Sequence, residues 1–178
     1  IVRIRFAINP LPAADGFYME VSALANDFEP PSPQPYDGGF DIIAQWWSPG
    51  NINPAFLCRE QYGGFCGNVG YHAKVHTNGA LEISRERPKD DNEPRDRYES
   101  LRRTVGGYSI VHPQGRQVRF RLEVSQKGPG SVFLEACVDN NQDGVWDERL
   151  EFLDQTRPIH GYFVPIIRSD WISAEFSE

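Results

Sequence analysis

The sequence predicts an all-β fold, an antiparallel β-sandwich of the jelly-roll (concanavalin-like) kind, and three observations lead to this prediction. Apolar and polar residues alternate with a period of two in many short segments of the 178-residue chain, as they do in half-buried strands. The chain holds 16 Gly and 14 Pro but only one Met, which suits a fold rich in turns. No segment keeps the helical period of about 3.6 residues convincingly. Because the length suits one core, we expect residues 1–178 to form a single β-sandwich domain.

Three strands are predicted in the first part of the chain, with proline-containing breaks between them. The first is "IVRIRFAI" at residues 1–8, which "NPLPAADG" ends. The second is "FYMEVSAL" at residues 17–24, whose inward face would carry Phe17, Met19, Val21 and Ala23. Residues 26–39 contain too many prolines for regular structure. The third is "FDIIAQWW" at residues 40–47, which is heavily apolar on both faces.

The segment "GYHAKVHTNG" at residues 70–79 has titratable side chains at every second position. In a strand, one face would carry Tyr71, Ala73 and Val75, and the opposite face would carry His72, Lys74 and His76. The Asn78-Gly79 pair predicts a hairpin turn, after which "ALEIS" begins the return strand. The histidine face is then either an ordinary solvated surface or the floor of a site.

The second half of the chain supplies the remaining strands. "RQVRFRLEVS" alternates most cleanly, and its inward residues would be Val118, Phe120, Leu122 and Val124. "SVFLEACV" and "VWDERLEFL" flank an Asp/Asn/Gly turn and should pair as a hairpin. "IHGYFVPII" is expected to be the last strand, at an edge or a bulge because it contains Pro165. In the charged run at residues 85–103 we expect a solvated first half, and one or two helical turns in "RDRYESLRR".

Charge and hydropathy narrow the range of partners. The net charge of −7 argues against general attraction to nucleic acid or to an anionic membrane, so we expect neither as a partner. No apolar run approaches the roughly 18 residues that a membrane helix needs. The chain begins at Ile1 without a signal-like segment, which suggests a mature or trimmed product. We expect a monomer that is secreted or periplasmic.

The three cysteines contribute to the expectation of secretion. Cys58 and Cys66 stand at the two ends of a short Gly-containing loop, "CREQYGGFC", a comfortable span for a local disulfide. Three free thiols, or a zinc site made by this pair and a histidine, remain alternatives, although the spacing is unusual for zinc. Cys137 lies in the apolar run "VFLEACV" and is expected to be a buried free thiol.

The loop "DNNQDGVWDERLEF" carries oxygen-bearing side chains at alternate positions, followed by Gly144. Calcium loops use this spacing, so the candidate ligands are Asp139, Asn141, Asp143, the Val145 carbonyl and Asp147. The match ends at the twelfth position, which is Leu150, and the flanks are predicted strands rather than helices. A structural calcium and a metal-free turn are about equally compatible with this pattern.

The strand that contains the two tryptophans either packs both of them or presents a ligand-binding face. Asp41, Ile43, Gln45 and Trp47 would share one face, and Trp46 would lie on the other with Phe40, Ile42 and Ala44. One tryptophan can therefore complete the core while Trp47 and Gln45 remain available to a ligand. Aromatic rings stack on the apolar faces of sugars, and amides bind hydroxyls or carboxylates.

The order of these segments resembles that of the jelly-roll polysaccharide lyases, broadly the alginate, glucuronan and heparin lyase types. The resemblance rests on "VRIRF", "GFYMEVSAL", "GGFDIIAQWWSPG", "GYHAKVHTNGALEIS", the strand pair in "RQVRFRLEVS…GSVFLEACVDNNQDGVWD" and "GYFVPII". Alginate lyases of this shape commonly carry Gln-Ile-His, where this chain has Gln45, Trp46 and Trp47. Of their Tyr-x-Lys-x-Gly-x-Tyr strand, only Tyr162 is retained. The resemblance implies a lyase that cleaves a uronic-acid-containing polysaccharide by β-elimination.

Such an elimination needs a group that neutralises the sugar carboxylate, a base and an acid. Gln45 and an arginine, Arg103 in our assignment, could serve the carboxylate, with Arg102, Arg119 and Arg121 extending a cationic track. The base would be His72 or His76, and the acid would be Tyr162, or Tyr71 if the strand twists. The substrate-binding residues would be Trp47, Tyr71, Lys74 and His76.

Three other functions remain open on the sequence alone. A non-catalytic carbohydrate-binding (lectin-like) module would use Trp46 or Trp47, Tyr62 and Tyr71 as stacking platforms. A glycoside hydrolase of the same fold would need two nearby carboxylates, and "DERLEF" gives no clear array of them. A structural or surface protein is the last alternative. The lyase hypothesis requires Gln45 and Tyr162 to lie on the same face as His72, Lys74 and His76.

Overall fold

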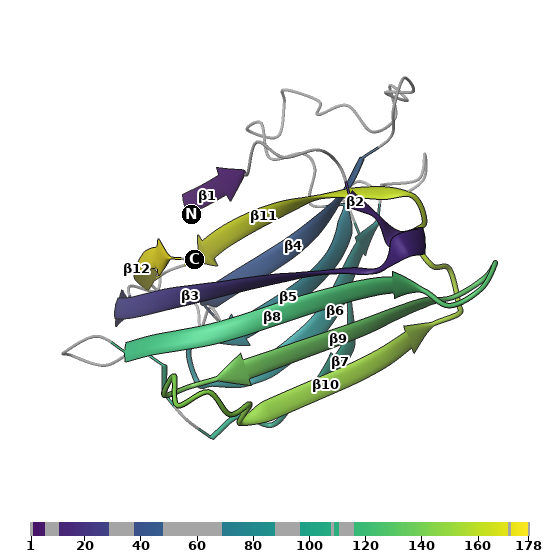
Figure 1. The fold of residues 1–178 in the computed structure, drawn as a ribbon. Coiled ribbons are helices and arrows are strands. Elements are labelled where there is room, and N and C mark those ends of the chain that lie inside the picture. Colours follow the sequence, from purple (N-terminus) through teal and green to yellow (C-terminus); the bar gives the residue numbers. More distant parts are fainter. Residues whose placement is uncertain are drawn as a thin grey trace.

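The computed structural model describes residues 2–5, 11–28, 38–47, 69–87, 97–107, 109–110, 116–170 and 172–177. These residues form two antiparallel sheets that pack face to face as two layers (Figure 1). The predicted all-β antiparallel sandwich is therefore confirmed. A 3-10 turn at Ala13–Asp15 is the one helical element among the described residues. None of them forms a helix with the length and apolarity that crossing a bilayer requires.

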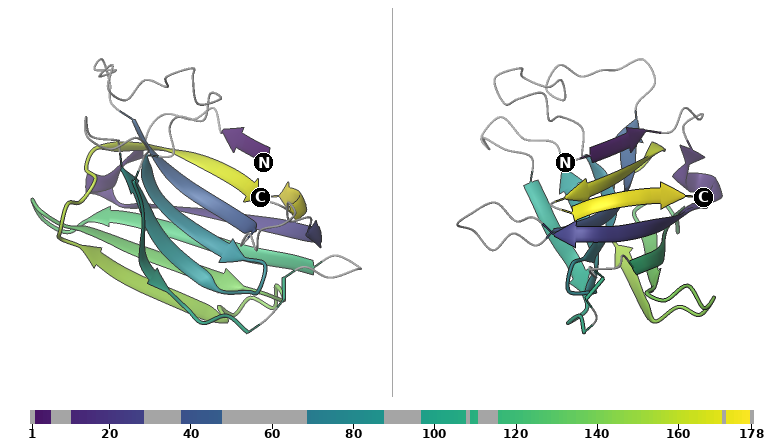
Figure 2. Two further views of the ribbon diagram at one scale, coloured as in Figure 1. Left: turned by 180° about the vertical axis from the view of Figure 1, so that it is seen from behind. Right: turned by 90° about the vertical axis from the view of Figure 1, so that its left-hand side faces the viewer.

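Sheet A has seven strands, six of them in the order β1-β11-β4-β5-β6-β7, with β2 pairing beside β11. Its strands are β1 (Val2–Arg5), β2 (Leu11–Pro12), β4 (Gly39–Trp47), β5 (Gly70–His76), β6 (Leu81–Arg87), β7 (Arg97–Arg103) and β11 (Tyr162–Asp170). The view from behind in Figure 2 looks onto this sheet. Four consecutive strands, β4 to β7, are thus neighbours in space, and β11 joins them from far along the chain.

Sheet B has five strands in the order β10-β9-β8-β3-β12. Its strands are β3 (Phe17–Phe28), β8 (Arg116–Gln126), β9 (Val132–Asp139), β10 (Glu148–Asp154) and β12 (Ile172–Ser177). The predicted hairpin is present as β9 and β10, and β3 extends beyond the predicted residues 17–24 to Phe28. The chain crosses between the sheets after β2, β3, β7, β10 and β11.

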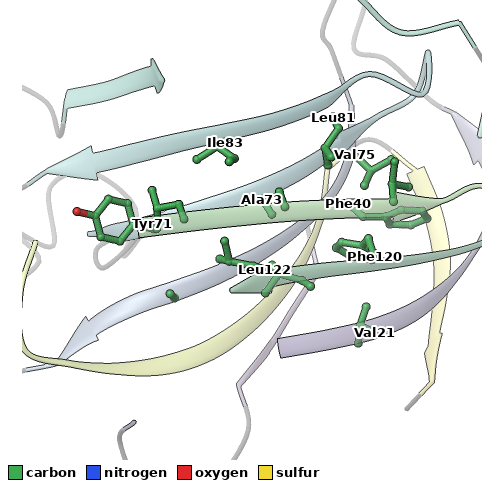
Figure 3. Close-up of a cluster of buried hydrophobic side chains, with 14 of the residues drawn as sticks. Val21, Phe40, Tyr71, Ala73, Val75, Leu81, Ile83, Phe120 and Leu122 are labelled. Atoms are coloured by element: carbon green, nitrogen blue, oxygen red, sulfur yellow. The ribbon is translucent and has the colours of Figure 1, made fainter. Parts of the chain in front are cut away.

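The hydrophobic core lies between the two sheets and confirms the predicted alternation. The predicted inward residues of β8 are fully buried, and so are those of β5. Figure 3 shows Tyr71, Ala73 and Val75 of β5 among the core residues, with Phe120 and Leu122 of β8. Rings of Phe40 and Phe120 stack across the core with their centroids 5.9 Å apart. Burial of these apolar faces is the main stabilising term of the sandwich.

Local turn chemistry fixes the β5–β6 hairpin as the sequence indicates. Gly79 takes a positive φ of 79°, which favours glycine, and its N–H donates to the His76 carbonyl at 2.8 Å. The Asn78 side chain accepts from the Ala80 N–H at 3.0 Å. This turn sets the register that places His72 opposite Ser84.

Several predictions of local structure are wrong. Residues 97–103, expected to contain helical turns, form strand β7, because their long-range pairing with β6 outweighs weak local preference. The segment at Tyr162–Asp170 is not the last strand, since β12 follows it, and it lies inside sheet A rather than at its edge. Pro165 is tolerated there because it falls between the residues that pair with β2 and those that pair with β1.

The irregular segment predicted at residues 26–39 is strand at both ends, since β3 runs to Phe28 and β4 begins at Gly39. The charged run, expected to be solvated from residue 85, begins inside β6, where Arg85 is buried. Residues 29–37 and 88–96 lie outside the described residues.

A buried polar cluster ties the two sheets together at one end of the sandwich. Arg85 of β6 donates to the Asp154 carboxylate at 2.5 Å and to the Glu99 carboxylate at 2.6 Å. The Tyr71 hydroxyl donates to the same Asp154 oxygen at 2.8 Å and accepts from the Ile159 N–H at 2.7 Å. We call Tyr71, Arg85, Glu99 and Asp154 the inter-sheet cluster. Since Asp154 ends β10, the cluster joins sheet A to sheet B.

Candidate functional site

The candidate site lies on the face of sheet A that is turned away from sheet B, which we call the outer face. Because side chains alternate along a strand, each strand gives every second residue to it. Its polar members with described side chains are Asp41, Gln45, His72, Lys74, His76, Glu82, Ser84, Glu86, Tyr98, Ser100, Arg103, Tyr162, Arg168 and Asp170. The predicted division of β5 into a core face and a histidine face is thus confirmed.

A row of alternating charges crosses five strands of this face. Strand pairing places these residues directly opposite one another in the order Arg168, Asp41, Lys74, Glu82, Arg103. Opposite charges on neighbouring strands stabilise each other, and Arg168 is hydrogen-bonded to Asp41 while Arg103 lies 3.7 Å from Glu82. We call these five residues the charged row. It fixes the positions of the side chains around the two histidines.

His72 lies beside the charged row, between two carboxylates. Its Nδ1 is 3.8 Å from the Asp41 carboxylate and its Nε2 is 3.7 Å from the Glu86 carboxylate. The imidazole side chain has no exposed surface (0%), and the Tyr98 ring packs edge-on against it with 6.1 Å between the centroids. His72 is therefore held by ionisable groups on both sides.

The Asp41 carboxyl stays ionised although it is buried. Burial alone would raise the pKa of this carboxyl, but the Arg168 guanidinium, His72 and Lys74 outweigh it and hold the pKa well below its usual range. A permanently charged Asp41 can stabilise a positive charge on His72 and favour one orientation of its ring. Asp41 thus completes a carboxylate–imidazole pair on the outer face.

His76 forms a second buried pair. Its Nε2 lies 2.6 Å from the Glu82 carboxylate, and the Tyr98 hydroxyl donates to the other oxygen of Glu82 at 2.9 Å. Burial would raise the pKa of Glu82, but hydrogen bonds from His76, Ser100 and Tyr98 lower it overall. Each histidine of β5 therefore has its own carboxylate partner. Of the two interpretations of the histidine face, an ordinary solvated surface is wrong, because His72 and His76 are both buried.

Gln45 and Tyr162 lie on the outer face with the histidines, as the lyase hypothesis requires. Gln45 opposes Gly70, two residues from His72, and Tyr162 opposes Trp47, two residues from Gln45. These residues therefore follow a diagonal across β11, β4 and β5. Tyr162 is 43% exposed, whereas Gln45 is nearly buried. Trp47 belongs to the same face by its place in β4, but its side chain lies outside the described residues.

Gly70, two residues before His72 in β5, pairs with Gln45 of β4 on one side and with Glu86 of β6 on the other. It contributes no side chain there, and no other residue fits, because a Cβ would lie 2.0 Å from the Ala44 carbonyl oxygen. The strand that carries His72 therefore presents bare backbone between these two polar side chains.

Four other predicted residues lie elsewhere. Tyr71 points into the core and belongs to the inter-sheet cluster, so it is corrected as a substrate-binding residue and as an acid on the outer face. Burial strongly raises the pKa of its hydroxyl.

The other three are arginines of the expected cationic track. Arg102 is on the side of β7 that faces sheet B and donates to the Glu151 carbonyl at 3.0 Å, so it cannot extend a cationic track on the outer face. Arg119 and Arg121 lie on β8, on the outer surface of sheet B, where both stack on Trp146 at 4.3 and 5.2 Å from its ring centroid. They cannot extend a cationic track on sheet A.

Arg103 and Lys74 remain on the outer face, but Arg103 is at its far side. It lies on β7, two strands away from β5, and pairs with Glu82. Neighbouring strands are about 4.8 Å apart, so the backbones of Arg103 and His72 are separated by about 10 Å or more. Lys74 is on the same strand as His72 and is the nearer cation.

Several members of the face escaped the sequence analysis as functional candidates. Asp41 was placed beside Gln45 but given no role, and Glu82, Glu86, Tyr98, Arg168 and Asp170 were not considered at all. The alternation of "ALEISRER" could have placed Glu82 and Glu86 opposite the histidines once the Asn78-Gly79 hairpin was accepted. The contribution of β11 could not be found in this way, because its partner β4 is distant in sequence.

The predicted calcium loop connects β9 and β10, and its side chains are hydrogen-bonded within the loop. Asp139 accepts from the Gly144 N–H at 3.1 Å, Asp143 from the Val145 N–H at 2.9 Å, and Asp147 from the Asn140 N–H at 2.7 Å. The Arg119 guanidinium is 3.4 Å from the Asp139 carboxylate. Among the residues described, no group of three or more His, Cys, Asp or Glu side chains is arranged to hold a metal ion. To bind a cation, these carboxylates would have to give up some of their hydrogen bonds within the loop.

Cys137 is a buried free thiol, as predicted. It lies next to Glu135, and burial together with that carboxylate raises the pKa of the thiol to about 11. It therefore stays protonated near neutral pH. Cys58 and Cys66, for which a disulfide was predicted, lie outside the described residues.

Comparison with known proteins adds no family to this picture. The chain matches no protein-family model and no curated protein sequence.

Proposed function

We propose that the protein is a polysaccharide lyase that cleaves a uronic-acid-containing polymer by β-elimination on the outer face of sheet A. The observation that supports the proposal is the diagonal of Tyr162, Gln45 and His72 across three adjacent strands. Diagonal neighbours on adjacent strands have side chains about 7–8 Å apart at their bases, within reach of long side chains. Tyr162 itself lies two strands and four residues from His72, about 15 Å between backbones, so the proposal requires both side chains to reach toward one sugar bound at Gln45, which lies between them.

In the proposed reaction, His72 removes the proton from the sugar carbon next to the carboxylate. The electrons of that C–H bond form a carbon–carbon double bond, and the glycosidic C–O bond breaks. Tyr162 donates its proton to the leaving oxygen and regains one from solvent. Gln45 and Lys74 bind the uronate carboxylate and so stabilise the charge that develops when the proton leaves, and Asp41 stabilises the imidazolium. Arg103 would contact the sugar chain further along the sheet.

The test is an ultraviolet assay with alginate, glucuronan, pectate and glycosaminoglycans as substrates. β-Elimination creates a double bond conjugated to a carboxylate, so absorbance is expected to rise with at least one polymer. Reducing-end release without a new chromophore would instead indicate a hydrolase. A flat absorbance trace with every polymer would contradict the lyase proposal.

One observation favours a second candidate, a non-catalytic carbohydrate-binding module. His72 has no exposed surface and lies between two carboxylates, which is also how a purely structural histidine is held. Tyr98 and Tyr162, both exposed on the outer face, would then serve as stacking platforms. Retardation in a polysaccharide-containing gel together with a flat absorbance trace would support this candidate.

A structural calcium in the β9–β10 loop and a secreted or periplasmic location are parts of the proposal. If the loop binds calcium, calcium at a hundred times its dissociation constant stabilises the fold by about 2.7 kcal/mol. We therefore expect added calcium to raise the thermal unfolding midpoint and a chelator to reverse the rise. Asp143→Ala should abolish this response, and Glu151→Ala, on the neighbouring strand, should retain it. Equal responses in both variants would contradict a calcium site at this loop.

A further inference from the structure

We propose that Tyr98 is a gate over His72, and that the outer face of sheet A admits a sugar to this histidine only when the tyrosine ring swings away. The inference rests on the proposed function, because it concerns access to the same site. It starts from the burial of His72, whose side chain has no exposed surface (0%) although it would have to reach a sugar. A side chain next to it must therefore move before the reaction can take place.

Tyr98 reaches His72 from the far side of β6. Its backbone lies opposite Glu86, whereas its hydroxyl donates to the carboxylate of Glu82, which is nearer the start of the same strand, at 2.9 Å. The side chain therefore runs along β6 past Ser84, which lies opposite His72 and is fully buried. The ring meets the imidazole edge-on, with 6.1 Å between the centroids. Tyr98 thus closes the β6 side of His72.

The neighbours of His72 differ in their freedom to move. The Asp41 side chain is 2% exposed and is hydrogen-bonded to Arg168, which fixes it in place. The Glu86 side chain is 14% exposed. Tyr98 is 48% exposed, and β7, which carries it, is the last of the described strands on its side of sheet A. Rotation about the Cα–Cβ bond of Tyr98 would therefore carry its ring outward, away from the described part of the sheet.

The closed position of the gate depends on two contacts. Opening breaks the hydrogen bond from Tyr98 to Glu82 and the edge contact with the His72 ring. Glu82 keeps other partners when the tyrosine leaves, because it is also bonded to His76 and lies 3.7 Å from Arg103. Contacts of these two kinds shift an equilibrium by about tenfold each, so the open form should make up about one molecule in a hundred.

The test measures how fast diethyl pyrocarbonate modifies His72, with mass spectrometry of the peptides to locate the modified histidine. The reagent transfers its ethoxycarbonyl group to a neutral imidazole nitrogen, and the ethyl carbonate that leaves takes up the imidazole proton and decomposes to ethanol and carbon dioxide. For a buried group, the rate follows the fraction of molecules in which that group is exposed. His160, which is partly exposed in the loop after β10, is the internal reference.

Removing the ring should leave His72 accessible in every molecule. Tyr98→Ala should therefore raise the modification rate of His72 about a hundredfold and leave the rate at His160 unchanged. Tyr98→Phe keeps the ring but loses the hydrogen bond to Glu82, so it should raise the rate at His72 about tenfold. Tyr18→Ala removes an exposed ring from sheet B and should leave the rate at His72 unchanged. An unchanged rate at His72 in Tyr98→Ala, or an equal rise at His160, would overturn the inference.

The absorbance assay separates this inference from the proposed function. Faster modification of His72 in Tyr98→Ala, together with a flat absorbance trace for every polymer, would support the gate and contradict the lyase. A rise in absorbance with one polymer, together with an unchanged modification rate in Tyr98→Ala, would support the lyase and contradict the gate.

Discussion

Replacing Tyr162 with phenylalanine is expected to lower the rate of elimination by about a hundredfold to ten-thousandfold, the usual contribution of a positioned proton donor. The change removes one hydroxyl from a ring that is 43% exposed, so the fold should be preserved. Binding of the polymer should change little, because the ring remains. The measurement is the initial rate of absorbance increase at saturating and at low polymer concentration.

A matched control for this variant exists on the other sheet. Tyr18 on β3 is 63% exposed, and Tyr18→Phe removes the same group far from the outer face of sheet A. Its rate should equal that of the unchanged protein. If Tyr162→Phe also keeps the full rate, Tyr162 is not the acid, and the proposed diagonal loses its catalytic role.

Replacing Arg85 with methionine is expected to lower the free energy of unfolding by about 3–5 kcal/mol, the usual effect of breaking a buried ion pair. The reason is that the Asp154 carboxyl, only 1% exposed, would lose the guanidinium that pairs with it. Since domains of this kind are stable by about 5–15 kcal/mol in total, the loss would be a large fraction. Equilibrium unfolding in urea, followed by tryptophan fluorescence, measures it.

Arg102 provides the control for the inter-sheet cluster. It also bridges the sheets, through a hydrogen bond to the Glu151 carbonyl at 3.0 Å, but its side chain is exposed. Arg102→Met should cost about 1 kcal/mol or less, because exposed contacts of this kind contribute little. Equal losses of unfolding free energy in Arg85→Met and Arg102→Met would mean that the buried charges of the inter-sheet cluster do not cause the destabilisation.

The parts of the fold that could be predicted are those in which local pattern and final environment agree. Strand β8 was recognisable because each inward position from Val118 to Val124 is apolar and the outward positions between them are charged. Strand β7 was not, because the β6–β7 pairing contains a register irregularity beside Ser84. An extra residue in one strand breaks the period of two, so Tyr98 and Leu101 are spaced as they would be in a helix.

The candidate site was only partly predictable, for a reason of register. Alternation identifies the face of the strand on which His72 or Gln45 lies. It does not identify which residue of the next strand lies opposite either of them. The charged row takes one residue from each of five strands, and β11 is far from the others in sequence. Burial of His72 and the inward position of Arg85 likewise depend on contacts between distant segments.

The strand order also bears on the sequence of events as the chain leaves the ribosome. The meanders β4 to β7 and β8 to β10 join neighbouring segments, so they can pair as soon as they emerge. Strand β11 must then insert between β1 and β4, and β12 must add to β3. Both layers therefore stay incomplete until the residues after Tyr162 are synthesised, and the edges of β3 and β4 stay open to wrong partners until then.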